Sequence, residues 1–202
     1  MTDRKAALRT ALRERRRALA PDDRAARSRL ACAALLRAPA LAAGSKVAVY
    51  LPVGCEIDTA PLITAARRRG VGLYVPVVVD RRRRRLEFHP LDGGPTRRGA
   101  YGIPVPPRSG RPVGTRWFDL VVVPLVGVDR DGRRLGMGGG YYDRAFAFRW
   151  TRRAWRGPRL IGLAFDCQRV ASTFAEPWDL RLDALATESG LIHFDRGSGG
   201  PR

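Results

Sequence analysis

The chain has 202 residues, the length of one domain at roughly 100–200 residues per domain. Hydrophobic residues make up 45% of it, an ordinary globular composition that argues against a disordered chain, and a chain of this length needs no disulfide or metal to fold. The charge is unusual, because 38 Lys and Arg residues against 19 Asp and Glu residues give a formal net charge of +19. Such an excess prompts a nucleic-acid hypothesis. However, only Lys5 and Lys46 are lysines, so arginine-favouring codon usage explains the excess equally well.

The first half of the chain predicts two helices and then an alternation of strands and a helix. Residues 2–19 carry an apolar stripe, and Pro21 begins a second helix that stops near Pro39. The elements expected next are a strand over 46–51, a helix over 59–69, a strand over 72–79, a charged turn over 81–85 and a returning strand over 86–90, as a hairpin or a short crossing strand.

The second half begins with a Gly-, Pro- and Arg-rich stretch over 92–116, which we interpret as a surface loop within the domain. The elements expected after it are a strand over 119–126, a turn over 129–132, a glycine loop, a helix over about 142–153, a strand over 160–165 and a segment over 185–194 that closes the sheet. Nearly continuous apolar strands that alternate with helices predict a mostly parallel sheet covered on both faces. We therefore expect an α/β fold, a Rossmann-like three-layer α/β/α sandwich in a single domain over 1–195, and a flexible tail over 196–202.

The cysteines and histidines exclude several kinds of site. The three cysteines are an odd number at wide spacings with no CxxC pair, which argues against a disulfide framework and a zinc knuckle. Their apolar neighbours predict small buried side chains. His89 and His193 have no partner nearby in the sequence, so neither a Ser-His-Asp relay nor a His-rich metal site is expected. No apolar run reaches the ~18–20 residues of a membrane helix, and the N-terminus lacks an apolar signal core, so we expect a cytoplasmic protein with no membrane contact.

The sharpest local motif is Arg134-Leu-Gly-Met-Gly-Gly-Gly-Tyr-Tyr-Asp143. Its glycines join a strand and turn to a helix, where several backbone N–H groups can face one anion beside the positive end of the helix. The motif is not a Walker loop, and Tyr141 stands where the dinucleotide fingerprint requires its third glycine. It predicts either a phosphate cradle or a flexible turn.

Two carboxylates and two cations have both a functional and a structural interpretation. Asp143, in the first turn of the expected helix, either complements the helix dipole or binds Mg²⁺, and Asp179 is a second candidate ligand. Lys5 and Arg9 share one helix face, which is either a phosphate-binding face or a solvated basic one. Glu56 follows the first strand, where ligands of open α/β sheets bind, although a turn carboxylate is equally plausible on local grounds.

Together these motifs resemble the 5-formyltetrahydrofolate cyclo-ligase family, also called 5,10-methenyltetrahydrofolate synthetase, from about Arg4 to Phe194. The pieces that carry the resemblance are Lys-x-x-x-Arg (Lys5, Arg9), Tyr-Leu-Pro-x-x-x-Glu-Ile-Asp-Thr (Tyr50 to Thr59), Gly-Ile-Pro-x-Pro (Gly102 to Pro106), the block from Asp119 to Arg144, Gly-Leu-Ala-Phe-Asp (Gly162 to Asp166) and Glu-Pro-Trp-Asp (Glu176 to Asp179).

The resemblance implies an ATP- and Mg²⁺-dependent ligase that cyclises 5-formyltetrahydrofolate to 5,10-methenyltetrahydrofolate. ATP would phosphorylate the formyl oxygen, N10 would attack the resulting iminium phosphate, and ADP and phosphate would be released. We expect a monomer that acts on a small folate, with or without a polyglutamate tail, and binds no specific nucleic acid. The alternative is a non-catalytic relative that binds folate or nucleic acid, prompted by the net charge and the arginine run over 81–85, although the aromatic-rich signatures of RNA-binding domains are absent.

The resemblance also implies roles for individual residues, but it names no catalytic residue. ATP-binding would fall to Lys5, Arg9, Arg134, Leu135, Gly136, Met137, Gly138, Gly139, Gly140, Tyr141 and Tyr142. Substrate binding would fall to Arg9, Leu51, Glu56, Met137, Gly138, Gly139, Gly140 and Tyr141, and metal binding to Asp143 and Asp179. Some family members carry a cation inside the glycine loop, where this chain has Met137 and Gly139, so the cation here must come from Arg134, Lys5 or Arg9.

Overall fold

The computed structural model describes residues 2–94, 97–105, 111–151 and 157–195. Its helices are α1 (Thr2–Arg17), α2 (Pro21–Leu35), α3 (Ala60–Arg68), α4 (Tyr141–Ala145) and α5 (Phe148–Thr151). The strands of its main sheet are β1 (Lys46–Ala48), β2 (Gly72–Asp80), β3 (Arg85–Pro90), β6 (Leu120–Pro124), β9 (Arg159–Leu163), β10 (Ala184–Thr187) and β11 (Gly190–His193). Two small strand pairs are β4 (Arg97–Arg98) with β5 (Pro104–Val105), and β7 (Gly127–Val128) with β8 (Arg134–Leu135).

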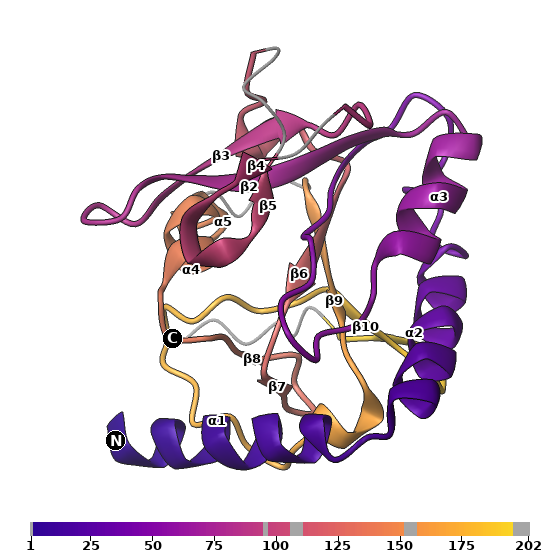
Figure 1. The fold of residues 1–202 in the computed structure, drawn as a ribbon. Coiled ribbons are helices and arrows are strands. Elements are labelled where there is room, and N and C mark those ends of the chain that lie inside the picture. Colours follow the sequence, from indigo (N-terminus) through magenta and orange to yellow (C-terminus); the bar gives the residue numbers. More distant parts are fainter. Residues whose placement is uncertain (1, 95–96, 106–110, 152–156, 196–202) are drawn as a thin grey trace.

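The sheet that these described ranges form has 7 strands in the order β11-β10-β9-β6-β1-β2-β3. Pairing is parallel from β10 to β2, and the two edge strands, β11 and β3, are antiparallel to their neighbours. Helices α2 and α3 lie on one side of the sheet and α4 and α5 on the other, while α1 crosses below the carboxyl ends of the central strands (Figure 1). The predicted α/β fold with a mostly parallel sheet is confirmed.

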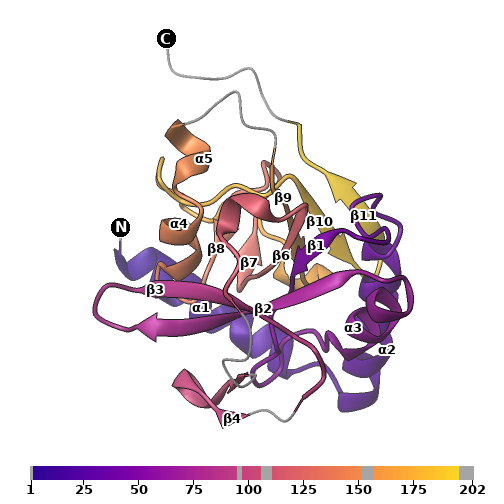
Figure 2. The same cartoon turned by 90° about the horizontal axis from the view of Figure 1, so that it is seen from above.

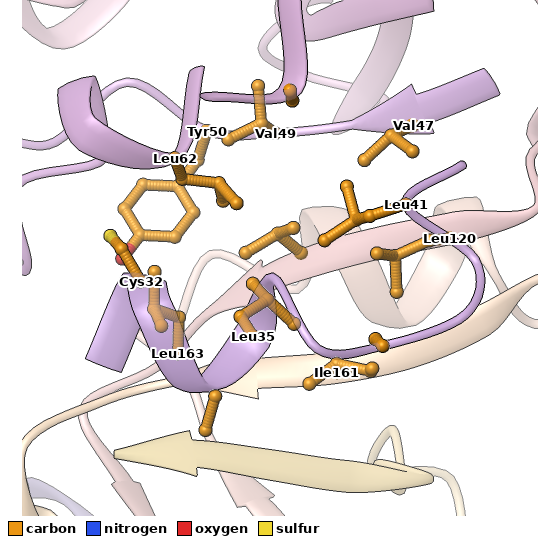
Figure 3. Packing of buried hydrophobic residues seen from close by; sticks show 14 of the residues in the cluster. Cys32, Leu35, Leu41, Val47, Val49, Tyr50, Leu62, Leu120, Ile161 and Leu163 are labelled. Atoms are coloured by element: carbon orange, nitrogen blue, oxygen red, sulfur yellow. The ribbon is translucent and has the colours of Figure 1, made fainter. Parts of the chain in front are cut away.

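Beyond the exposed first residue of β1 and of β9, the central strands β1, β6 and β9 are apolar because both of their faces are buried. Along β6, Leu120 and Val122 pack toward α2 and α3, whereas Val121 and Val123 pack toward Phe88 and its aromatic neighbours on the other side. Figure 3 shows the first of these layers, in which Leu35, Leu41 and Leu62 lie over the sheet residues Val47, Leu120, Ile161 and Leu163 and over Val49, which directly follows β1. The two layers hold the carboxyl ends of β1 and β6 in place.

Several predicted elements are shorter than the sequence indicated. The strand expected over 46–51 ends its ladder at Ala48, because the chain then leaves the sheet toward Pro52, which has no N–H to donate. The helix expected over 142–153 is two short helices within the described residues, and 152–153 lie outside them. Phe146 is buried in one core cluster and Phe148 packs against the same cluster, and side chains at i and i+2 of one continuous helix face different ways, so the helix breaks where both residues reach this cluster.

Other segments contain more structure than was predicted. The stretch over 92–116, interpreted as a loop, holds β4, β5 and two short 3₁₀ turns in its described part. The segment over 185–194 is an antiparallel hairpin of β10 and β11 rather than one strand. Residues 86–90 do form a hairpin, since β3 pairs with β2. The tail over 196–202 lies outside the described residues, and the domain limits stay a prediction.

Candidate functional site

A cavity of about 1000 Å³ opens at the carboxyl ends of β1 and β6, where ligands of open α/β sheets bind. Its walls come from α1, from the segment after β1, from the β2–β3 hairpin and from the loop that joins β8 to α4. Each residue for which the sequence predicted a binding role lines it: Lys5, Arg9, Leu51, Glu56, Arg134, Leu135, Gly136, Met137, Gly138, Gly139, Gly140, Tyr141, Tyr142, Asp143 and Asp179. The structure thus brings together motifs that are far apart in the chain, while their individual roles stay predictions.

Helix α1 brings two cations to the cavity. The Lys5 ammonium lies 2.6 Å from Oδ2 of Asp179, and Arg9 donates from Nε to the carbonyl oxygen of Gly136 over 2.9 Å. The helix is held against the β7–β8 pair by Leu12, which is buried together with Val126 and Leu135. Lys5 and Arg9, at i and i+4, therefore face the glycine loop from a fixed helix.

The glycine loop, residues 136–140, needs glycine for two separate reasons. Gly138 and Gly140 have φ values of +94° and +66°, a region that L-residues with a Cβ adopt only at a cost. At Gly139 the conformation is ordinary, but a Cβ there would lie 2.8 Å from the Tyr141 ring. Gly140 is the N-cap of α4, so the loop ends where that helix begins. The backbone of this loop can approach a ligand closely.

Arg134 contacts three other residues that line the cavity. Its side chain is only 5% exposed and donates from Nη1 to the Pro124 carbonyl oxygen over 3.1 Å and from Nη2 to Oδ1 of Asp143 over 2.9 Å. Its guanidinium carbon lies 5.6 Å from the centre of the Tyr142 ring, within the range of a cation–π contact. Arg134 thereby fixes the carboxylate of Asp143 and the ring of Tyr142.

The two predicted metal ligands are Asp143 and Asp179. In each of them, one of the two carboxylate oxygens accepts no hydrogen bond from the described residues. Asp143 accepts at Oδ1, from Arg134 and from the Leu180 N–H at 3.1 Å. Asp179 accepts at Oδ2, from Lys5 and from the Glu176 N–H at 2.8 Å. Within the described ranges, no group of three or more His, Cys, Asp or Glu residues is placed to hold a metal ion. Two carboxylates fit Mg²⁺, which binds through one or two carboxylates together with waters and substrate phosphates. They do not fit an ion whose ligands all come from the protein.

Glu56 lies where the segment after β1 enters the cavity. Its Oε2 accepts a hydrogen bond from the Val53 N–H over 3.0 Å, which closes a tight turn and holds the carboxylate in place. Burial raises the pKa of Glu56 above its ordinary value, while the Val53 N–H and the charges of Arg16 and Arg13 act in the opposite direction. Glu56 is therefore a carboxylate held in a poorly solvated wall, suited to accept hydrogen bonds from a ligand.

Some residues of the cavity wall were not predicted from the sequence. Arg84 from the β2–β3 turn, Arg13 from α1 and Trp178, next to Asp179, all line the cavity. Trp178 is 66% exposed, which is unusual for a tryptophan in a folded chain. The Arg81–Arg85 run was visible in the sequence as a charged turn, but only the pairing of β2 with β3 shows where that turn lies.

The remaining polar candidates do not contribute to this cavity. His89 is buried with Nε2 3.3 Å from Oε2 of Glu87, so it has a partner that the sequence did not indicate. Cys32 is buried, as predicted, and burial raises its pKa to about 11, whereas Cys55 and Cys167 are half-buried.

None of the helices in the described ranges is both long and apolar enough to cross a bilayer.

Comparison with known proteins gives one consistent result. Residues 1–188 match the model of the 5-formyltetrahydrofolate cyclo-ligase family. The 5-formyltetrahydrofolate cyclo-ligase of Escherichia coli K12 is 34% identical over 184 residues, which are 88% of this chain and 97% of that protein. The mouse protein of the same name is 24% identical, over 91% of this chain and 93% of its own. The solved structure of Aquifex aeolicus 5,10-methenyltetrahydrofolate synthetase superposes with a TM-score of 0.80 at 26% identity, covering 98% of this chain and 96% of that one.

Proposed function

The chain belongs to the 5-formyltetrahydrofolate cyclo-ligase family, and we propose that it converts 5-formyltetrahydrofolate to 5,10-methenyltetrahydrofolate in a reaction that consumes ATP and needs Mg²⁺. The observation that carries the proposal is the single cavity shared by the glycine loop, the two cations of α1, Glu56 and the two aspartates. A two-substrate reaction needs both ligands in one cavity so that the reacting atoms meet. The names of the relatives supply the substrate and the product.

The nucleotide phosphates would lie against the glycine loop and the cations of α1. Lys5 and Arg9 face that loop, and backbone N–H groups of Gly138, Gly139 and Gly140 would complete the anion site. Lys5 is held by Asp179 in the structure. On phosphate binding its ammonium would exchange or share this partner, which places a positive charge where the transferred phosphoryl group needs neutralisation.

The folate would occupy the part of the cavity between Leu51, Glu56 and the glycine loop. Glu56 would accept hydrogen bonds from the pterin N–H groups, and Met137, which is 52% exposed, would cover the ring together with Tyr141 and the loop glycines. Arg9 would lie near both ligands, because it spans from α1 to the loop. This division places the folate beside Leu51 and Glu56, and the nucleotide with its ion beside the cations of α1 and the two aspartates.

Mg²⁺ would be held by Asp143 and Asp179, each through the carboxylate oxygen that accepts no hydrogen bond from the described residues. When bound, the ion neutralises charge on the nucleotide phosphates. Arg134 keeps the Asp143 carboxylate oriented, and the Glu176 N–H does the same for Asp179. The protein thus positions the ligands of the ion through residues outside its coordination sphere.

In the proposed reaction the formyl oxygen takes the terminal phosphoryl group of ATP and ADP leaves. N10 of the folate then attacks the formyl carbon of the iminium phosphate, loses its proton and expels inorganic phosphate, which leaves the methenyl bridge. This chemistry asks the protein for positioning and charge neutralisation rather than for a covalent nucleophile. The absence of any His or Cys from the described lining of the cavity agrees with it.

The test is the growth of methenyl absorbance when purified protein is mixed with 5-formyltetrahydrofolate. Product should form only with both ATP and Mg²⁺ present, with one ADP and one phosphate released per product. Folded protein that forms no product under these conditions would refute the proposal. Folate binding without turnover would instead favour the non-catalytic relative. A cytoplasmic location and a monomeric state stay predictions.

A further inference from the structure

The tip of the β2–β3 hairpin reaches the glycine loop from the side opposite α1. The hairpin extends past the main sheet toward α4 (Figure 2), and Arg84 at its tip lines the cavity. A Cβ built on Gly140 would lie 3.3 Å from Nη1 of Arg84, and one built on Gly138 would lie 3.6 Å from the guanidinium carbon of Arg9. Two guanidinium groups from distant parts of the chain therefore flank the same loop. We propose that Arg84 is a phosphate-binding residue of the nucleotide site, an inference that rests on the function proposed above.

The backbone at Arg84 is held in an unfavourable conformation. Its φ is +54°, in the left-handed region where glycine or asparagine usually closes a hairpin turn. The turn is fixed by the Arg83 N–H, which donates to Oδ1 of Asp80 over 2.8 Å, and by a shift of register between Val78 and Asp80. Strained positions of this kind gather at ligand-binding sites, where the strain accompanies a side chain that function requires. A glycine would close this turn with less strain, but it would remove the cation.

Arg84 also differs from the other cations of the cavity in its partners. Lys5 is paired with Asp179, Arg134 with Asp143, and Arg9 donates to Gly136. In the described ranges no residue accepts a hydrogen bond or forms an ion pair with the Arg84 guanidinium. Its donors are thus available to a ligand without the loss of a contact within the protein. A guanidinium presents them as a planar fork that matches phosphate oxygens.

The position favours a phosphate over the carboxylates of a folate tail. Arg84 lies over Gly140, the residue at which the loop turns into α4, and Asp143 follows one turn later. A phosphate chain placed on the loop and bound to a metal at Asp143 must pass this point. The loop over 136–140 contains no cationic residue, so Arg84 supplies a positive charge from outside the loop.

The experiment compares Arg84→Gln and Arg84→Gly with Arg82→Gln, which removes the same charge from the same exposed turn but from a residue that does not line the cavity. Calorimetric titration with ATP and Mg²⁺ gives the Kd, and turnover gives the KM for each substrate. Loss of a charged hydrogen bond to phosphate should raise the Kd and the KM for ATP about tenfold or more in both Arg84 variants. Arg82→Gln and the KM for folate should stay within about twofold of wild type.

Stability separates this role from a structural one. Because Arg84→Gly relieves the left-handed backbone, its Tm should equal or exceed that of the wild type even though it binds ATP more weakly. Wild-type affinity for ATP in Arg84→Gln overturns the inference, as does an equal loss in Arg82→Gln, which would indicate general attraction by charge. A rise in the KM for folate alone would assign Arg84 to the folate carboxylates and also overturn it. Wild-type protein that binds ATP but forms no product would refute the proposed function, while the shift in Kd would still support Arg84 as a phosphate ligand.

Discussion

The ammonium of Lys5 lies 2.6 Å from a carboxylate oxygen of Asp179, although 174 residues separate them in the chain. The pair joins the first helix to the loop that precedes β10 and closes one side of the cavity. Both side chains are mostly buried, with 15% and 19% of their areas exposed. In the proposed reaction each has a second partner, the nucleotide phosphates for Lys5 and Mg²⁺ for Asp179, so the ion pair holds both groups near the places where they are needed.

We predict that Lys5→Met lowers kcat/KM for ATP about 10- to 100-fold, because a charged hydrogen bond to phosphate is lost. The free energy of unfolding should fall by about 1–3 kcal/mol, because the variant leaves the mostly buried Asp179 carboxylate without its charged partner. Steady-state kinetics and urea unfolding measure the two effects. Arg4→Met is the matched control, because it removes the same charge from the neighbouring exposed position and should keep wild-type kinetics. Equal losses in both variants would contradict a specific role for Lys5.

Asp143→Asn should raise the Mg²⁺ concentration needed for half-maximal activity about tenfold or more, because an amide oxygen binds a hard cation more weakly than a carboxylate does. The measurement is a Mg²⁺ titration of turnover at saturating ATP. Asp183→Asn is the control: Asp183 lies outside the cavity lining, and it accepts hydrogen bonds from Arg149 and the Leu160 N–H at 2.9 and 2.8 Å. That variant should lose about 1–2 kcal/mol of stability with an unchanged Mg²⁺ requirement. An unaltered Mg²⁺ titration in Asp143→Asn would remove Asp143 from the metal site.

The raised pKa of Glu56 gives a pH dependence with a definite sign. Only the ionised carboxylate accepts hydrogen bonds at both oxygens, so the KM for folate should rise as the pH falls through the pKa of Glu56. This rise should occur at a higher pH than the pKa of an ordinary glutamate, because the pKa of Glu56 is raised. The stability of the fold depends on pH in the opposite direction, because the folded chain binds the Glu56 proton more tightly than the unfolded chain does. The stability that this group contributes is therefore lost as the pH rises from the pKa of Glu56 in the unfolded chain to its pKa in the folded chain. Glu56→Gln should abolish this part of the pH profile of KM and weaken folate binding at neutral pH. A profile that is the same in Glu56→Gln and wild type would assign the titration to another group.

The sequence predicted the sheet well because its signals are local. Every residue from Leu120 to Val123 is buried, so an unbroken apolar run was itself the sign of a central parallel strand. The glycine loop was recognisable for the same reason, since positive φ at Gly138 and Gly140 leaves a mark in the composition of one short segment. Predictions of this kind need no knowledge of what lies across the fold.

The features that the sequence did not reveal depend on contacts between distant segments. Arg84 was one of a run of exposed arginines, and only the pairing of β2 with β3 places it, unlike Arg82, in the cavity wall. The break between α4 and α5 has the same origin, because the packing of Phe146 and Phe148 in one cluster competes with helix continuity. Asp179 was predicted as a metal ligand, but its ion pair with Lys5 was not predicted.

The position of α1 rests on a close contact between Leu12 and Gly127. Leu12 is 1% exposed, and a Cβ on Gly127 would lie 2.5 Å from its Cδ1, so the glycine provides the space into which the leucine packs. Leu12→Ala should cost about 2–5 kcal/mol of stability, and Gly127→Ala should push the helix away and raise the KM for ATP through Lys5 and Arg9. In the double variant the new methyl group occupies part of the space that the leucine leaves. Its destabilisation should therefore be smaller than the sum of the two single values by about 0.5 kcal/mol or more. Urea unfolding of the three variants measures this coupling, and strictly additive values would mean that Leu12 and Gly127 do not position the helix together.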